Sequence, residues 1–244
     1  MPLKVLSYNI WDGGGDRIPS IVAVIRAHAP DAVALIEAND PEAAGRLAGD
    51  LSMSMVLGEV ANGHHVVWLS RLPIVGAENH RSPLLAKTLL EIEVRHERET
   101  WSLFATHLGS RHDVPKPVGE IPLILDVMGR RAGRPHLLVG DLNALRPDDP
   151  VGSPPPGVAK RGEAVDGTPR PALLPLLAAG YLDAYRALQP DLPGYTHPAD
   201  APWPRLDYVF LAPSLTGQLA ACDVDAGPEA ARASDHLPIW AELS

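Results

Sequence analysis

The sequence has little of several features that mark particular classes of protein. Cys222 is the only cysteine among the 244 residues, so no disulfide can form within the chain, and such usage is compatible with a reducing compartment. No apolar run approaches the roughly 20 residues that span a bilayer. The N-terminus MPLKVLSYNIW lacks the apolar run and cleavage site of a signal peptide. We therefore expect a cytoplasmic protein with no membrane span.

Basic residues are also in short supply. The chain has 21 Lys and Arg against 30 Asp and Glu, which gives a formal net charge of −9. An acidic surface repels the phosphate backbone of nucleic acids, which usually recruits Lys and Arg. The balance disfavours avid, sequence-blind binding of nucleic acid. It leaves room for a local basic cleft, and acidic residues gathered around a cation would contribute to it.

Aromatic residues make up only 5% of the chain, whereas hydrophobic residues make up 45%. The hydrophobic share is typical of soluble globular proteins, so we expect a core built on Val, Ile, Leu and Ala. The 26 Pro and 21 Gly are too many for a helical bundle and indicate many turns.

Short β-rich runs alternate with helical segments along the chain. We expect strands at 4–10, 32–37, 55–60, 65–70, 73–78, 85–94, 101–108, 136–140, 205–211, 219–224 and 237–243. We expect helices at 18–29, 41–50, 121–128 and 173–179. The stretch at about 146–171 contains DDP, PPP and TPRP and is interpreted as a long Pro-rich surface loop. A linker between two domains is the alternative, but strands of similar character on both sides favour one domain over 1–244.

Polar residues stand at the ends of the apolar runs. They are Asn9, Glu37, His107, Asp141, Asn143, Asp207, Asp235 and His236. Each has an ordinary structural explanation by itself, such as a turn cap, a helix-dipole partner or a satisfied core histidine. Burying charged groups beside apolar strands is costly unless they are paired or bind a metal. Their recurrence in different strands predicts a shared site at one edge of a sheet.

The segments around these residues resemble the endonuclease/exonuclease/phosphatase superfamily. The matching segments are SYNIW, HAPDAVALIE, WLSRLPI, ATHLGS, VGDLNA, RLDYVFL and SDHLPIW, in the order typical of the family from residue 7 to residue 240. The superfamily includes pancreatic-type deoxyribonucleases, exonuclease III-like repair enzymes and inositol polyphosphate 5-phosphatases. The resemblance implies an α/β fold, a four-layer sandwich of two mostly antiparallel sheets flanked by helices.

The resemblance also implies a metal site. Glu37 is similar to the principal Mg²⁺ ligand of the family, with Asn9 and Asp235 beside the ion. Mg²⁺ prefers oxygen ligands and keeps several waters, so one or two carboxylates suffice. Mn²⁺ is expected to substitute for it.

The catalytic roles that the resemblance implies fall on five further residues. Asp141 matches the aspartate that orients or deprotonates the attacking water, and Asn143 matches its phosphate-contacting neighbour. His236 resembles the histidine that is paired with an aspartate, here Asp207. His107 matches the second histidine, which bonds a non-bridging phosphate oxygen. Together they would stabilise the charge that gathers on phosphate oxygens in the transition state.

Other positions are less specific or depart from the family pattern. His197, in GYTHPAD, falls in a region that lines the substrate entrance in relatives and is a candidate substrate contact. Some deoxyribonucleases supply a carboxylate for the first histidine near the position of His64 and His65. No carboxylate occurs there, so the partner of His107 is left open.

These expectations define a divalent-metal-dependent phosphoesterase, with a phosphodiesterase or nuclease as the leading activity and an activated water as nucleophile. Its substrate would be a nucleic acid or a small phosphodiester, and no protein partner is indicated, so a monomer is expected. A small-molecule, inositol or sugar phosphatase of the same fold is one alternative, and a non-catalytic binding module is another. AP-endonuclease relatives usually have QETK where this chain has IEAND, which disfavours a DNA-repair role.

Overall fold

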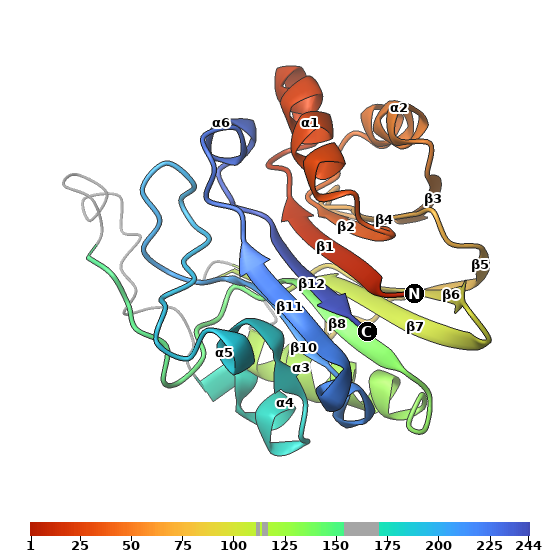
Figure 1. The fold of residues 1–244 in the computed structure, drawn as a ribbon, viewed down its shortest axis with the longest axis vertical. Helices are drawn as coiled ribbons and strands as arrows, with labels where there is room; N and C mark the ends of the chain where they lie inside the picture. Colours follow the sequence, from red (N-terminus) through yellow and green to blue (C-terminus); the bar gives the residue numbers. More distant parts are fainter. Residues whose placement is uncertain (111–112, 114–116, 154–170) are drawn as a thin grey trace.

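Two six-stranded sheets lie face to face in the computed structural model, which describes residues 1–110, 113, 117–153 and 171–244 (Figure 1). In the first sheet the strand order is β11 (Leu219–Val224), β12 (Ile239–Leu243), β1 (Leu3–Asn9), β2 (Ala32–Ile36), β4 (Val66–Ser70) and β3 (Ser54–Gly58). In the second it is β5 (Ile74–His80), β6 (Leu89–His96), β7 (Glu99–His107), β8 (His136–Asp141), β10 (Asp207–Leu211) and β9 (Leu182–Asp183).

Each sheet is mixed, with one parallel pair. β1 runs parallel to β2, and β7 runs parallel to β8. The other neighbouring strands in the described part of both sheets pair antiparallel. The predicted sandwich of two mostly antiparallel sheets is therefore confirmed.

Helices cover the outer faces of the sandwich (Figure 1). The first sheet is covered by α1 (Ile18–His28), α2 (Pro41–Leu51) and α6 (Ala230–Ala233). The second is covered by α3 (Pro117–Gly129) and α4 (Leu174–Ala178). The short helix α5 (Ala184–Leu188) contacts β10 of the second sheet and β11 of the first. Short 3₁₀ helices are η1 (Gly15–Arg17), η4 (Pro171–Leu173) and η5 (Pro213–Gln218). No helix in the described ranges is long and apolar enough to cross a membrane.

Three apolar layers follow from this arrangement. Val5 and Trp68 lie between the two sheets, Leu6 and Tyr8 pack against the helices of the first sheet, and Phe104 packs on the helical side of the second. Successive strand residues point to opposite faces of a sheet, and both faces of β1, β4 and β7 are buried. These strands therefore consist of nearly continuous apolar runs. The polar residues at their ends are for that reason conspicuous in the sequence.

The helices predicted at 18–29 and 41–50 are found as α1 and α2 with nearly those bounds, whereas α3 begins at Pro117, four residues before its predicted start. Asp40 caps α2 by accepting hydrogen bonds from the backbone N–H groups of Glu42 and Ala43, both at 3.0 Å, and Pro41 occupies the first turn. Ala29 ends α1 in a left-handed conformation.

Other element boundaries differ from the sequence-based expectation. The run 85–94 was expected to be extended throughout, but β6 begins at Leu89, because Ala86 donates its N–H to Glu120 and Lys87 turns to Asp113. The short elements β9, α5 and α6 were not predicted. The predicted Pro-rich loop at about 146–171 falls mostly outside the described residues, which omit 154–170.

Candidate active site

The topology gathers the polar strand ends at one end of the sandwich. β1 and β2 run parallel, so Asn9 at the end of β1 and Glu37 just after β2 lie side by side. β7 and β8 also run parallel, and the register pairs His107 with Asp141. β10 runs the opposite way and starts at Asp207, directly opposite Asp141. The chain termini lie at the other end, where Leu3 pairs with Leu243.

Asn9 links the two sheets at this end. Its side chain is almost fully buried, and its Nδ2 donates to Glu37 Oε1 at 3.4 Å and to Asp141 Oδ2 at 3.2 Å. Its Oδ1 accepts the backbone N–H of Trp11 at 3.0 Å. Glu37 itself has a left-handed φ of 57°, and its Oε2 accepts the N–H of Asp12 at 3.1 Å. The amide of Asn9 thus fixes the distance between the two carboxylates.

Asp141 lies at the centre of the group. Its Oδ1 accepts the backbone N–H of Asn143 at 3.0 Å, and its Oδ2 lies 3.6 Å from His107 Nε2 and 3.7 Å from His236 Nε2. Burial raises the pKa of Asp141 to about 7, against the charge of His236, which lowers it, while Asp207 adds to the rise. A carboxylate with a pKa near neutrality is suited to take a proton at neutral pH.

His236 is held as an imidazolium by carboxylates. Its Nδ1 lies 2.8 Å from Asp207 Oδ2. Burial lowers the pKa of His236, but Asp207 and Asp141 outweigh this effect and raise the pKa to about 10. Both ring nitrogens therefore carry hydrogen at neutral pH, and Nε2 can donate towards the position of Asp141 Oδ2.

His107, in contrast to His236, is uncharged. It is buried, and burial together with the positive charge of Lys87 holds its pKa well below the usual value, so the ring is neutral at pH 7. Within the described residues its Nδ1 has no hydrogen-bond partner, and neither has Nδ1 of His64, whose ring meets His107 edge-on at 6.2 Å. In the described part of the chain the carboxylates near His107, those of Asp141 and Glu37, lie on the Nε2 side of its ring, and no carboxylate pairs with Nδ1.

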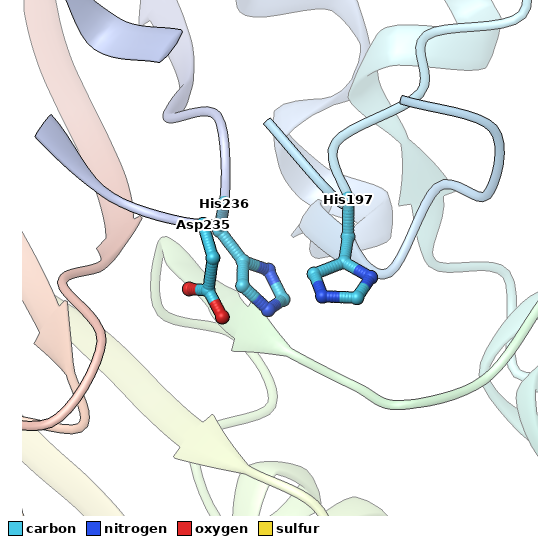
Figure 2. A group of neighbouring side chains, drawn as sticks. All are labelled: His197, Asp235 and His236. Carbon is cyan, nitrogen blue, oxygen red and sulfur yellow. The ribbon is translucent and has the colours of Figure 1, made fainter. Parts of the chain in front are cut away.

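The other predicted site residues lie around this centre. Asn143 has a left-handed φ of 45°, and its Nδ2 donates to the Leu108 carbonyl at 3.0 Å. Asp235 precedes His236 in the last turn before β12, and burial raises its pKa. Figure 2 shows the rings of His197 and His236 facing each other, with a centroid distance of 4.6 Å, and the carboxylate of Asp235 on the other side of His236. Burial and the charge of His236 lower the pKa of His197 to about 3.

The donor groups fit a hard divalent cation, but not with His236 as a ligand. Two groups at this end of the sandwich bring potential ligand atoms within 4.8 Å of one another: His197 with Asp235 and His236, and Asp141 with Asp207 and His236. A protonated imidazole has no lone pair to offer, so His236 is a poor ligand in both. Burial raises the pKa values of Asp141 and Asp235, and repulsion by the carboxylates of Glu37 and Asp207 adds to the rise. A cation among their oxygens would relieve this repulsion.

A family comparison agrees with the geometry. The model of the Endonuclease/Exonuclease/phosphatase family matches residues 6–236. The chain belongs to this family. Comparison with curated protein sequences gives no significant match.

Solved structures of the endonuclease/exonuclease/phosphatase fold resemble this chain over its whole length. The 3′ phosphatase NExo from Neisseria, bound to a product DNA hairpin, matches with a TM-score of 0.78 and 19% identity, covering 99% of each chain. An AP endonuclease from Archaeoglobus fulgidus matches with a TM-score of 0.77 and 18% identity, again over 99% of each chain. Humanized D. rerio TDP2 matches with a TM-score of 0.72 and 20% identity, over 100% of this chain and 99% of the other. At these identities the likeness shows the fold.

Sequence reasoning did not single out Lys87. Its side chain is almost fully buried, its Nζ lies 2.7 Å from Asp113 Oδ2, and its charge acts on His107. Because 85–94 was interpreted as one strand, Lys87 was taken as part of the strand. A lysine next to the apolar residues Leu85 and Ala86 was the available signal, since a buried ammonium group needs a partner or a function.

Proposed function

We propose that the protein is a divalent-metal-dependent phosphodiesterase, with nuclease activity as its leading form, that hydrolyses its substrate by direct attack of an activated water. One observation carries the proposal: the buried carboxylate of Asp141 lies 3.6 Å from Nε2 of His107, a neutral imidazole, and 3.7 Å from Nε2 of His236, an imidazolium. A structural cluster does not require three titratable groups held in such different states.

The residues divide the reaction between them. Asp141 accepts a proton from the water whose oxygen forms the new bond to phosphorus. The bond to the leaving oxygen breaks on the opposite side, and the departing alkoxide takes up a proton from solvent water to become the alcohol. His236 donates from Nε2 to a non-bridging phosphate oxygen, and Asp207 holds the imidazolium in place. His107 and Asn143 contact the remaining phosphate oxygens. His197, packed on His236, contacts the substrate at the entrance.

Asn9, Glu37 and Asp235 would hold the cation, which we propose to be Mg²⁺, with Mn²⁺ as a substitute. When bound, the ion supplies Lewis-acid stabilisation of the charge that develops on the phosphate oxygens. Asn9 ties Glu37 to Asp141, so the ligand carboxylate and the proposed base keep a fixed spacing before the substrate arrives.

A phosphatase acting on a small molecule is the second candidate. The likeness to the Neisseria 3′ phosphatase supports it, and the likeness to the AP endonuclease and to D. rerio TDP2, which has been solved with a single-strand DNA product, supports the nuclease. A non-catalytic module is less well supported, because every predicted site residue is present at one end of the sandwich. We further propose that residues 1–244 form one domain and that the protein acts as a cytoplasmic monomer.

The test compares chromogenic diesters with monoesters. Hydrolysis of bis-(p-nitrophenyl) phosphate and of p-nitrophenyl phosphate is measured with Mg²⁺, with Mn²⁺ and with EDTA. Diester turnover that EDTA abolishes supports the phosphodiesterase. A preference for the monoester redirects the assignment to a phosphatase, and silence on both substrates together with no Mg²⁺ binding points to the non-catalytic module.

A further inference from the structure

Trp11 lies at the rim of the candidate site with its side chain exposed. It follows Asn9 by two residues, and its backbone N–H donates to Asn9 Oδ1 at 3.0 Å. Its side chain is 49% exposed, and it is the one tryptophan among the large exposed apolar residues in the part of the chain that the structure describes. It belongs to none of the three apolar layers there. A half-exposed indole at this position adds little to the apolar packing of the fold.

Arg17 holds the indole in place. Its guanidinium carbon lies 4.6 Å from the centroid of the Trp11 ring, and its Nη1 donates to the carbonyls of Ile10 at 3.0 Å and Ala233 at 2.9 Å. Ala233 lies two residues before Asp235. Through Arg17, Trp11 is therefore anchored between the turn that carries Asn9 and the turn that carries Asp235. The guanidinium of Arg17 covers one part of the ring.

The backbone at Trp11 is strained. Its φ is 52°, and that of Asp12 is 49°, a left-handed conformation that is uncommon for a bulky residue. Such conformations carry a free-energy cost and persist where the surroundings enforce them, often at functional sites. Here they keep a large apolar ring at the surface, where about half of the residue stays exposed to solvent. The strain and the exposure point to a ligand that covers the ring.

We propose that Trp11 is a stacking platform for the nucleobase of a nucleotide whose phosphodiester is cleaved. The inference rests on the proposed function and narrows its substrate class to nucleotide diesters. Every base has a flat face that stacks on an aromatic side chain, and such stacking tolerates any base sequence. The net charge of −9 disfavours affinity through the phosphate backbone, so a contact that does not depend on charge is what this chain needs to hold a nucleotide.

The experiment compares two diesters that share the p-nitrophenolate leaving group. One is thymidine 5′-(p-nitrophenyl phosphate), and the other is methyl p-nitrophenyl phosphate, which has no base. The ratio of their kcat/KM values is measured for the wild type, W11A and W11F. We expect W11A to lower the ratio about tenfold, as loss of one base–aromatic stack should, and W11F to retain most of it. Leu174→Ala, which removes a similarly exposed side chain from α4, is the matched control and should leave the ratio unchanged.

A second measurement does not depend on turnover. Thymidine 5′-monophosphate should quench the tryptophan fluorescence of the wild type, and W11F, which keeps the other tryptophans, should lose this quenching. A ratio that W11A leaves unchanged, or quenching that survives in W11F, overturns the inference even if the enzyme is active. If the wild type turns over neither diester, the proposed function fails, and the quenching alone then decides whether Trp11 binds a base.

Discussion

At the residue scale, Asp141 lies between two imidazoles, one positively charged and one neutral. His236 is paired with Asp207 and positively charged, whereas His107 is buried beside Lys87 and neutral. The difference comes from neighbours rather than from the histidines themselves, because a carboxylate favours the charged ring and burial disfavours it. Asp141 can therefore face a hydrogen-bond donor on one side and a neutral ring on the other.

Removing either of two groups should abolish activity without unfolding the protein. We expect Asp141→Asn and His236→Ala each to lower metal-dependent turnover by about 100-fold or more, since the base or a phosphate-oxygen donor is lost. Turnover of bis-(p-nitrophenyl) phosphate measures the effect, and circular dichroism checks the fold. His96→Ala is the control, because His96 contacts the carbonyl of Met1 at the opposite end of the sandwich. Normal activity in either site variant would refute these roles.

Binding of Mg²⁺ should depend on pH through Asp141. The folded-state pKa of about 7 is above the ordinary 3.8, so the stability that Asp141 contributes is fully present below about pH 3.8 and lost as pH rises through about 7. A cation beside the ionised carboxylate relieves this loss. The rise in melting temperature on adding Mg²⁺ should therefore be larger at pH 8 than at pH 6. His236 keeps its charge over this interval, since its pKa is about 10. Equal shifts at both pH values would count against the account, and Asp141→Asn should reduce the difference.

At the scale of elements, the positions of the main strands were predictable because both of their faces are buried. Continuous apolar runs such as 136–140 need no knowledge of the partner strand to be recognised, and the polar residue that ends each run predicted the site. The parallel pairing of β1 with β2 and of β7 with β8 then accounts for why Asn9, Glu37, His107 and Asp141 meet.

The elements that were not predicted depend on tertiary contacts. β9 has two residues, and α5 and α6 have five and four, lengths at which local sequence carries little signal. Asp183 caps α5 by accepting the N–H of Arg186 while it also binds Arg205 from a distant part of the chain. The absence of a hydrogen-bond partner at His107 Nδ1 in the described residues and the contact of Lys87 with Asp113 likewise depend on distances that spacing in the sequence does not fix.

Arg205 connects the segment just before β10 with the loop that carries Asp149 and with Asp183 of β9. Its fully buried guanidinium binds Asp149 Oδ2 at 2.8 Å and Asp183 Oδ2 at 2.6 Å, just before β10 brings Asp207 into the site. Arg205→Met would remove the buried cation that both carboxylates share, while Asp149 keeps Arg186 and Asp183 keeps Arg146. We expect the free energy of unfolding to fall by about 3 kcal/mol. Urea unfolding measures it. Arg232→Met removes an exposed partner of Glu229 and should cost under about 1 kcal/mol. Similar losses in the two variants would contradict the role given to the buried pair.

At the scale of the whole molecule, a negative net charge surrounds a site proposed to bind a phosphate. An enzyme that draws its affinity from many phosphate contacts loses it steeply as salt rises, with a slope of about −0.9 per contact on duplex DNA. The net charge of −9 predicts that affinity for duplex DNA depends only weakly on salt here. Affinity for duplex DNA, measured by mobility shift in EDTA, should be weak and should change little between about 50 and 200 mM salt. A steep salt dependence would reveal a basic groove that the overall charge does not suggest.

The central claim is that the polar strand ends of the two sheets form one metal-dependent phosphoester hydrolase site. The most direct measurement is the rate of bis-(p-nitrophenyl) phosphate hydrolysis by the purified wild type, first with Mg²⁺, then with excess EDTA, and then after Mg²⁺ is restored. The account predicts turnover that EDTA abolishes and that restored Mg²⁺ recovers. It also predicts that the Asp141→Asn variant shows no such turnover under any of these conditions. Turnover that persists in EDTA, or that Asp141→Asn retains in full, would contradict it.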